Sequence, residues 1–116
     1  MRVPYTDLQV FKAEFFRALA HPIRIRLIEE LRTGTRSVQE LQEALGLDQP
    51  SVSQQLSILR AKNLVTASKS GTSVRYAVRD PLIHDLFATA RAIFNTHLTE
   101  TQTMLKELRR ERRRAQ

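Results

Sequence analysis

Apolar residues recur at helical spacing along most of the chain, and polar capping residues mark where the helices begin. Thr6 and Gln9 form a capping box, which predicts a first helix over residues 7–20. The residue before a proline avoids the helical conformation, whereas proline itself suits a first helical turn. His21-Pro22 therefore separates this helix from a second one, predicted over residues 22–32.

Two further helices are predicted close together. Ser37 and Glu40 form a second capping box and begin a helix over residues 37–45. Asp48-Gln49-Pro50 is typical of another helix start, and the apolar spacing that follows predicts a helix over residues 49–62. Two helices joined by so short a turn indicate a helix-turn-helix.

The pattern becomes strand-like over residues 65–78. Two short runs rich in β-branched residues flank a loop that contains Gly71, which predicts a hairpin. Asp80-Pro81 then begins a helix predicted over residues 81–113, since no proline or glycine follows. The predicted fold class is mostly α with a small β-hairpin wing. We expect one winged helix-turn-helix domain over residues 1–116, with a long C-terminal dimerisation helix and a basic tail.

The last predicted helix carries more apolar surface than the rest of the chain can cover. Its apolar positions alternate four and three residues apart, which is the a/d pattern of a helix seam. A helix of about 30 residues spans roughly 45 Å. Part of the seam belongs to the core, and we expect the remainder to meet a second copy. The predicted dimer interface comprises Leu8, Phe11, Phe15, Ile83, Phe87, Ala90, Phe94, His97, Thr101 and Met104.

The composition excludes several classes of function. The chain has no cysteine, which removes disulfides, thiolate metal sites and cysteine nucleophiles. Its apolar runs are too short to span a membrane and its first five residues do not resemble a signal peptide, so we expect a cytoplasmic protein. It has neither a glycine-rich phosphate loop nor a clustered carboxylate pair, so we expect no enzyme.

The net charge of +7 favours a polyanionic partner, for which nucleic acid is the usual choice. More than half of this excess positive charge lies in residues 106–116, however, which contain six basic residues and only two acidic ones. A solvated helix end explains that segment as simply as a DNA contact does. DNA binding is therefore inferred from the pattern of residues within the predicted fold.

The outward face of the predicted helix over residues 49–62 is rich in serine and glutamine. These side chains donate and accept hydrogen bonds, and glutamine can pair with adenine through two bonds. The second helix of a helix-turn-helix lies in the major groove, and basic residues of a hairpin can reach phosphates. The alternative is an ordinary solvated face. The predicted contacts with double-stranded DNA are Ser37, Gln49, Pro50, Ser51, Ser53, Gln54, Gln55, Ser57, Arg60, Lys69, Thr72, Ser73 and Arg75.

Two separated segments resemble the ArsR/SmtB-type family of winged helix-turn-helix repressors. Residues 15–27 resemble its opening LA-H-P-x-R-x-x-I/L, and residues 49–60 its recognition-helix stretch S-x-S-x-H-L-x-x-L-R, with Gln55 where the family often has His. Gly71 and Arg75-Tyr76 match the hairpin. The resemblance implies a homodimeric repressor at a palindromic operator, released by an inducer that is often a metal or metalloid.

The sequence departs from the family at the positions where relatives bind metals. A cysteine pair of many members corresponds to Ser37 and Gln39, which do not bind soft metals. A second family site, shared between the last helices of two protomers, keeps His97 and Glu100, and His84 falls at the family's Asp position. His84, His97 and Glu100 are thus candidate ligands for Zn²⁺ or Ni²⁺. Alternatively, His97 packs in the seam and the protein has no cofactor; the sequence predicts no particular inducer.

Two other functions stay open. A nonspecific nucleic-acid-binding protein driven by charge would bind all duplexes alike, with a steep dependence on salt. A protein-interaction module that uses the last helix would bind another protein and little DNA. The uncharged face of the helix over residues 49–62 favours sequence-specific regulation over charge-driven binding.

Overall fold

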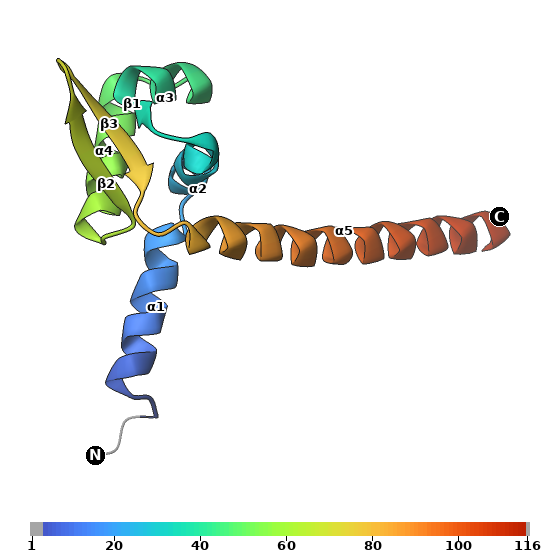
Figure 1. The fold of residues 1–116 in the computed structure, drawn as a ribbon. Coiled ribbons are helices and arrows are strands. Elements are labelled where there is room, and N and C mark those ends of the chain that lie inside the picture. Colours follow the sequence, from blue (N-terminus) through green and yellow to red (C-terminus); the bar gives the residue numbers. More distant parts are fainter. Residues whose placement is uncertain (1–3, 116) are drawn as a thin grey trace. The chain divides into compact units, whose positions relative to one another are not determined.

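The computed structural model describes residues 4–115 and consists of helices with one small sheet (Figure 1). Its contacts divide the chain into two units, one ending at Pro81 and one beginning at Leu82, where the sequence predicted one domain. The elements are α1 (Asp7–Leu19), α2 (Pro22–Glu30), a 3₁₀ turn η1 (Leu31–Thr33), β1 (Arg36–Ser37), α3 (Val38–Leu45), α4 (Gln49–Ala61), β2 (Val65–Ser70), β3 (Ser73–Val78) and α5 (Leu82–Ala115).

The two predicted capping boxes are both present. At the start of α1 the backbone N–H of Thr6 donates to Gln9 Oε1 at 2.9 Å, and that of Gln9 donates to Thr6 Oγ1 at 3.3 Å. Ser37 and Glu40 make the same reciprocal pair at the start of α3, each at 3.1 Å. These bonds satisfy N–H groups that have no partner inside the helix, and so fix where each helix begins.

The start of α2 is capped in a way that the sequence did not predict. His21 precedes Pro22, and its ring Nδ1 accepts a hydrogen bond from the backbone N–H of Ile23 at 3.1 Å. The histidine thus takes the place of the usual serine or aspartate cap. His21 is a structural residue here, as its place in the turn predicted.

The core of the first unit lies where α2, α3 and α4 meet. Its fully buried side chains are Leu27, Ile28, Leu41, Val52, Leu56, Leu59 and Val65. Each helix contributes one apolar stripe, and burial of such side chains stabilises the fold by about 1.5–3 kcal/mol apiece relative to exposure. The opposite faces of these helices carry the polar residues, so the core fixes which face of α4 points outward.

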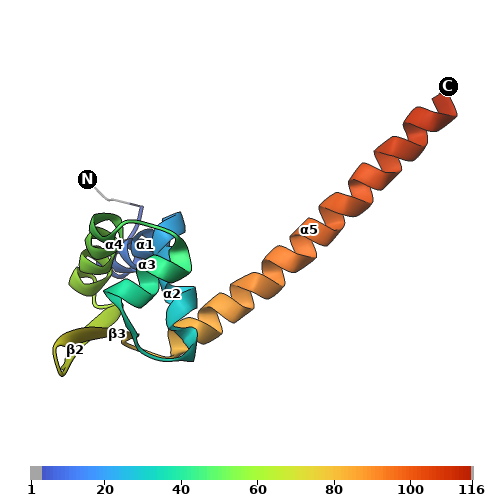
Figure 2. The same cartoon turned by 90° about the horizontal axis from the view of Figure 1, so that it is seen from above.

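The sheet has three antiparallel strands in the order β1-β3-β2. β2 and β3 form the predicted hairpin, with paired residues from Val65↔Val78 at its base to Ser70↔Ser73 at its tip. The sequence did not predict β1, because a strand of two residues is too short to show an alternating pattern. β1 pairs Arg36 with Tyr76 and Ser37 with Arg75. It thus joins the beginning of α3 to the hairpin of β2 and β3, which Figure 2 shows from above.

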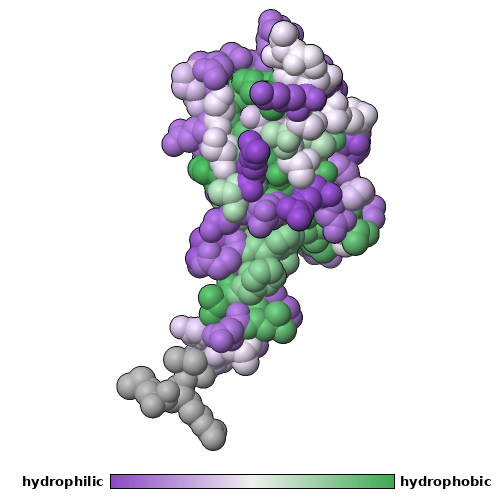
Figure 3. Space-filling view, turned by 60° about the vertical axis from the view of Figure 1, so that its left-hand side comes forward, coloured by the Kyte–Doolittle hydropathy of each residue, from purple (hydrophilic) through white to green (hydrophobic). Residues whose placement is uncertain are grey.

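The second unit is the single helix α5, which runs over 34 residues without a break. Every described side chain from Arg91 to Arg114 is exposed in one protomer, including Phe94 and Met104, which are both 62% exposed. α1 likewise exposes apolar side chains, with Phe11 at 70%, and Figure 3 shows them in green above the grey N-terminal residues. These two helices carry most of the large apolar side chains that are exposed in one protomer.

Leu41→Ala should destabilise the folded protein by about 2–5 kcal/mol, since it leaves a cavity among side chains that are fully buried. Urea unfolding followed by circular dichroism, at one fixed protein concentration, measures this loss. Glu43→Ala, on the exposed face of the same helix, is the matched control and should change stability by less than about 0.5 kcal/mol. Equal effects of the two substitutions would contradict the placement of the core.

Candidate DNA-binding interface

α3 and α4 form the predicted helix-turn-helix. Gly46 ends α3 in the left-handed conformation, with φ of 69°, and the N–H groups of Gly46 and Leu47 both donate to the carbonyl of Gln42. Such a bonding pattern closes a helix and turns the chain sharply. Arg26 of α2 also stabilises this turn, because its guanidinium donates hydrogen bonds to the carbonyls of Ala44 and Leu45 at 3.3 and 3.2 Å.

The outward face of α4 is polar and uncharged along most of its length. Gln49, Pro50, Gln54, Ser57 and Arg60 are exposed, whereas Ser51, Ser53 and Gln55 are half-buried on the flanks. The first turn is braced by a hydrogen bond from Gln49 Nε2 to Ser53 Oγ at 2.8 Å. The structure therefore brings the residues predicted to contact DNA onto one surface of α4, where their role as DNA contacts stays a prediction.

Two of these residues are held by bonds within the protein. The side-chain oxygen of Gln55 accepts a hydrogen bond from Arg24 Nη1 at 3.0 Å. The hydroxyl of Ser37 accepts the capping bond from Glu40. The sequence did not predict this role of Arg24, because Arg24 and Gln55 are 31 positions apart and no local pattern pairs them.

The exposed tip of the wing, the hairpin of β2 and β3, carries the other predicted contacts. Lys69, Thr72 and Ser73 are exposed, and Gly71 adopts the left-handed conformation, with φ of 64°, that the tight turn requires. The Ser73 hydroxyl donates to the carbonyl of Ser70 at 3.3 Å and closes the turn. The tip thus presents one cation and two hydroxyl groups to solvent.

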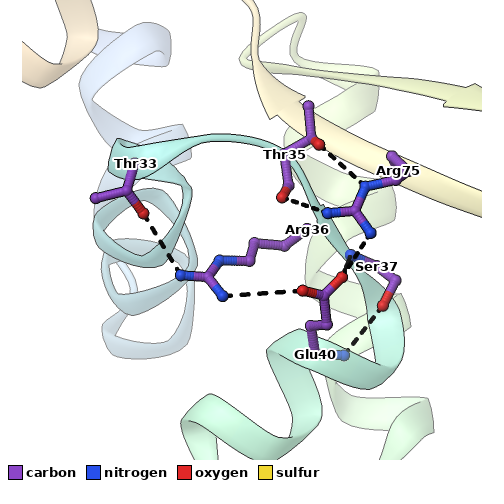
Figure 4. Close-up of polar contacts among 6 residues, drawn as sticks. All are labelled: Thr33, Thr35, Arg36, Ser37, Glu40 and Arg75. Carbon is purple, nitrogen blue, oxygen red and sulfur yellow. Dashed lines mark hydrogen bonds and ion pairs between the residues drawn. The ribbon is translucent and has the colours of Figure 1, made fainter.

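Arg75, also predicted to contact DNA, anchors the wing to α3 (Figure 4). Its Nη1 donates to Glu40 Oε1 at 2.6 Å, its Nε to Thr35 Oγ1 at 3.0 Å and its Nη2 to the Thr35 carbonyl at 2.7 Å. Three of the five N–H groups of the guanidinium are thereby engaged. Arg36 approaches the other oxygen of Glu40 at 3.9 Å. A contact of Arg75 with phosphate would have to use its two remaining N–H groups or break this cluster.

Glu40 is the centre of the cluster. The backbone N–H of Ser37 holds the pKa of the Glu40 carboxyl below its usual value, and the Ser37 hydroxyl and Arg75 lower this pKa further. The carboxylate is consequently charged at neutral pH, and it ties the start of α3 to β3. The wing and the helix-turn-helix are therefore linked by one ionised group.

The residues of the predicted dimer interface lie on α1 and α5. Leu8, Phe11, Phe94, His97, Thr101 and Met104 are exposed; Phe15, Phe87 and Ala90 are half-buried; Ile83 is buried. Phe15 also packs edge-on against Phe16, with ring centroids 5.4 Å apart. The exposed set is the part of the prediction that one protomer leaves available to a second copy.

The candidate metal ligands do not meet within one protomer. His84 and His97 both lie on α5, and a separation of 13 residues corresponds to about 20 Å along a helix. Across the described residues 4–115, no group of three or more His, Asp or Glu side chains could hold a metal ion. A site made of His84, His97 and Glu100 would need both protomers, and it stays a prediction.

Comparison with known proteins identifies a family and solved structures that this chain resembles. The family model described as "Bacterial regulatory protein, arsR family" matches residues 21–67. The HTH-type transcriptional regulator Rv0081 of Mycobacterium tuberculosis is 41% identical over 103 residues, which are 88% of this chain and 90% of that protein. Its crystal structure superposes with a TM-score of 0.77 over 83% of this chain and 97% of that one, at 40% identity.

Two further relatives extend the comparison. The probable mercury resistance operon repressor of Streptomyces lividans is 42% identical over 81 residues, 70% of this chain and 65% of that protein. A fragment of Mb0332 from Mycobacterium bovis, described as a homodimeric winged helix-turn-helix DNA-binding domain, superposes with a TM-score of 0.72 at 27% identity over 84% of this chain and 94% of that one.

The fold and the comparisons together identify this protein as a winged helix-turn-helix transcriptional regulator that binds DNA. The chain belongs to the arsR family of bacterial regulatory proteins. The family and the fold class predicted from the sequence are thereby confirmed. Within residues 4–115, no helix combines the length and the apolar character that a membrane span requires.

The lowered pKa of Glu40 predicts an acid-sensitive link between the wing and α3. A carboxyl whose pKa is lower in the folded than in the unfolded state stabilises the fold above its unfolded pKa, near 4.5, and this contribution is lost as the pH falls through the folded value. Melting temperatures measured from pH 7 to pH 3 should therefore fall less steeply for Glu40→Gln than for the natural protein. Parallel curves would contradict the role given to this carboxylate.

A metal site that draws on both protomers predicts a definite stoichiometry. Such a site would bind one or two ions per dimer in calorimetric titration of the purified protein with Zn²⁺ and Ni²⁺, and His97→Ala would abolish the binding. Gln102→Ala, also on an exposed position of α5, is the control that should leave it intact. Absence of binding to the natural protein would leave His97 as a residue of the helix seam.

Proposed function

We propose that this regulator is a homodimeric repressor that reads a palindromic operator through α4. The observation that carries the proposal is the surface of α4: serine and glutamine side chains point outward from a helix whose opposite face is fixed in the core. Such side chains make specific hydrogen bonds to base edges, each well-placed pair contributing about 1–3 kcal/mol of discrimination.

The distribution of charge supports specific reading over charge-driven binding. Arg60 is the only ionised side chain within Gln49–Ala61, whereas Lys69 and Arg79 lie on or beside the wing. Phosphate contacts position a protein on the duplex, and base contacts select the sequence. We assign positioning to the cations at these margins and selection to the uncharged centre of α4.

The uncovered apolar side chains of α1 and α5 support assembly into a dimer. Phe11 on α1, and Phe94 and Met104 on α5, are each more than 60% exposed in one protomer, and exposed large apolar side chains on a helix face mark an interface. The Mycobacterium bovis relative is described as homodimeric. A two-fold axis would place two α4 helices in successive major grooves, about 34 Å apart.

Repression is the regulatory direction that we propose, because the Streptomyces lividans relative is named a repressor. A dimer bound over a promoter blocks polymerase by occupying the same DNA, so the function needs binding and no catalytic step. An inducer would have to prefer a dimer geometry unsuited to the operator, and a hundredfold loss of operator affinity corresponds to about 2.7 kcal/mol of coupling.

The double variant Ser53→Ala/Gln54→Ala tests the assignment of α4. The operator is first selected from random duplexes with the natural protein, and its affinity is then measured by fluorescence anisotropy. We expect the double variant to lose about 10- to 100-fold in affinity for the selected operator, because hydrogen bonds to base edges are removed. Its weak affinity for random duplexes should stay unchanged.

Two controls separate recognition from folding and assembly. Glu29→Ala, at an exposed position of α2, should leave operator binding intact. Light scattering should give the same molar mass for the double variant and the natural protein. Unchanged operator affinity in the double variant would show that α4 does not read the DNA.

A further inference from the structure

Arg24 of α2 joins three elements around the recognition helix α4. Its Nε donates to the carbonyl of Ala18 in the last turn of α1 at 2.8 Å, and its Nη1 donates to Gln55 Oε1 on α4 at 3.0 Å. Both bonds are partly buried. A single guanidinium therefore connects the end of α1 to the flank of the surface proposed to read DNA.

The bond to Ala18 has a cause in the sequence. In a helix the carbonyl of residue 18 would accept from the backbone N–H of residue 22, and residue 22 is proline, which has no N–H. Arg24 supplies the missing donor. Because the guanidinium is planar and its Nε is committed to this carbonyl, the direction in which Nη1 points is also set.

The bond to Gln55 then fixes the orientation of the glutamine amide. A guanidinium has only donors, so the Gln55 atom that faces Arg24 must be the carbonyl oxygen. The NH₂ group of the amide consequently points away from Arg24. Gln55 is half-buried and lies one turn after Ser51, on the same flank of α4.

We propose that Arg24 is a positioning residue that orients the Gln55 amide so that its NH₂ group, rather than its oxygen, is presented to the operator. The proposal rests on the function proposed above for α4. Guanine presents two acceptors in the major groove, N7 and O6, and thymine presents O4, so these bases suit the Gln55 NH₂ group. Adenine presents its N7 acceptor beside an amino donor and cytosine presents an amino donor, so both suit the NH₂ group less well than guanine does.

Gln54, the neighbouring residue, provides a contrast within the same helix. Its side chain is exposed, and no hydrogen bond is found for it in the described part of the chain. Gln54 keeps both its oxygen and its NH₂ group, which is what pairing with adenine through two bonds requires. Two adjacent glutamines thus differ in base preference because one of them is held by an arginine.

The test compares base preferences, which a merely structural residue would not alter. Duplexes related to the selected operator by single base-pair changes are titrated with the natural protein, Gln55→Ala, Arg24→Ala and the double variant. Arg24→Lys is added in case Arg24→Ala unfolds, since lysine keeps the charge but lacks the planar fork. Gln54→Ala serves as the matched control.

We expect one position in each half-site to prefer guanine or thymine with the natural protein. Gln55→Ala should flatten the preference at that position by about 5- to 100-fold. Arg24→Ala or Arg24→Lys should instead raise the affinity for duplexes with adenine at the same position, because the Gln55 amide can then rotate and present its oxygen. In the Gln55→Ala background, Arg24→Ala should change nothing at this position, and Gln54→Ala should act on a different one.

Several results would overturn the inference. These are a preference for adenine at the Gln55 position in the natural protein, no position affected by Gln55→Ala, or an equal loss on all duplexes with Arg24→Ala and Arg24→Lys. The last result would make Arg24 a structural residue only. Failure of the natural protein to select any sequence would instead overturn the proposed function, and this inference with it.

Discussion

The apolar contact between α2, α3 and α4 is the constraint on which the rest of the first unit depends. Leu27, Leu41 and Leu56 are each no more than 1% exposed, and they leave each helix a single orientation in which its apolar stripe is covered. The polar stripe of α4 is directed outward as a consequence of this packing. The orientation of the surface proposed to read DNA is therefore set by the packing of the core. Substitutions on the outward face of α4 can then alter recognition while the buried face preserves the fold.

Arginines hold the remaining parts in place around this core. Arg24 joins α1 to α4, Arg26 covers the last carbonyls of α3, and Arg75 ties β3 to the start of α3. Each donates hydrogen bonds to backbone or side-chain oxygens of a neighbouring segment. Part of the positive charge of the chain is thus structural. The net charge of +7 overstates the charge available for binding phosphate in the folded regulator.

Local signals in the sequence were sufficient for most of the fold. The capping pairs Thr6/Gln9 and Ser37/Glu40, the glycine at 46 and the hairpin around Gly71 are interactions between near neighbours, so their spacing predicts them. The sequence could not show β1, the bond between Arg24 and Gln55, or the anchoring of Arg75, because these depend on residues that only folding brings together. For the same reason the sequence identified the polar face of α4 but gave Gln54 and Gln55 equal roles.

The exposed apolar faces of α1 and α5 have a consequence for gene control. In the proposed dimer, those faces are covered only when two protomers meet, so the amount of DNA-binding species follows mass action. At concentrations below the dimer dissociation constant, it rises with the square of the protomer concentration. A twofold change in synthesis then becomes about a fourfold change in dimer, and operator occupancy responds more steeply than expression does. In this proposed dimer, the apolar surface of α1 and α5 would contribute to the dissociation constant and so to the protein concentration at which the operator is occupied.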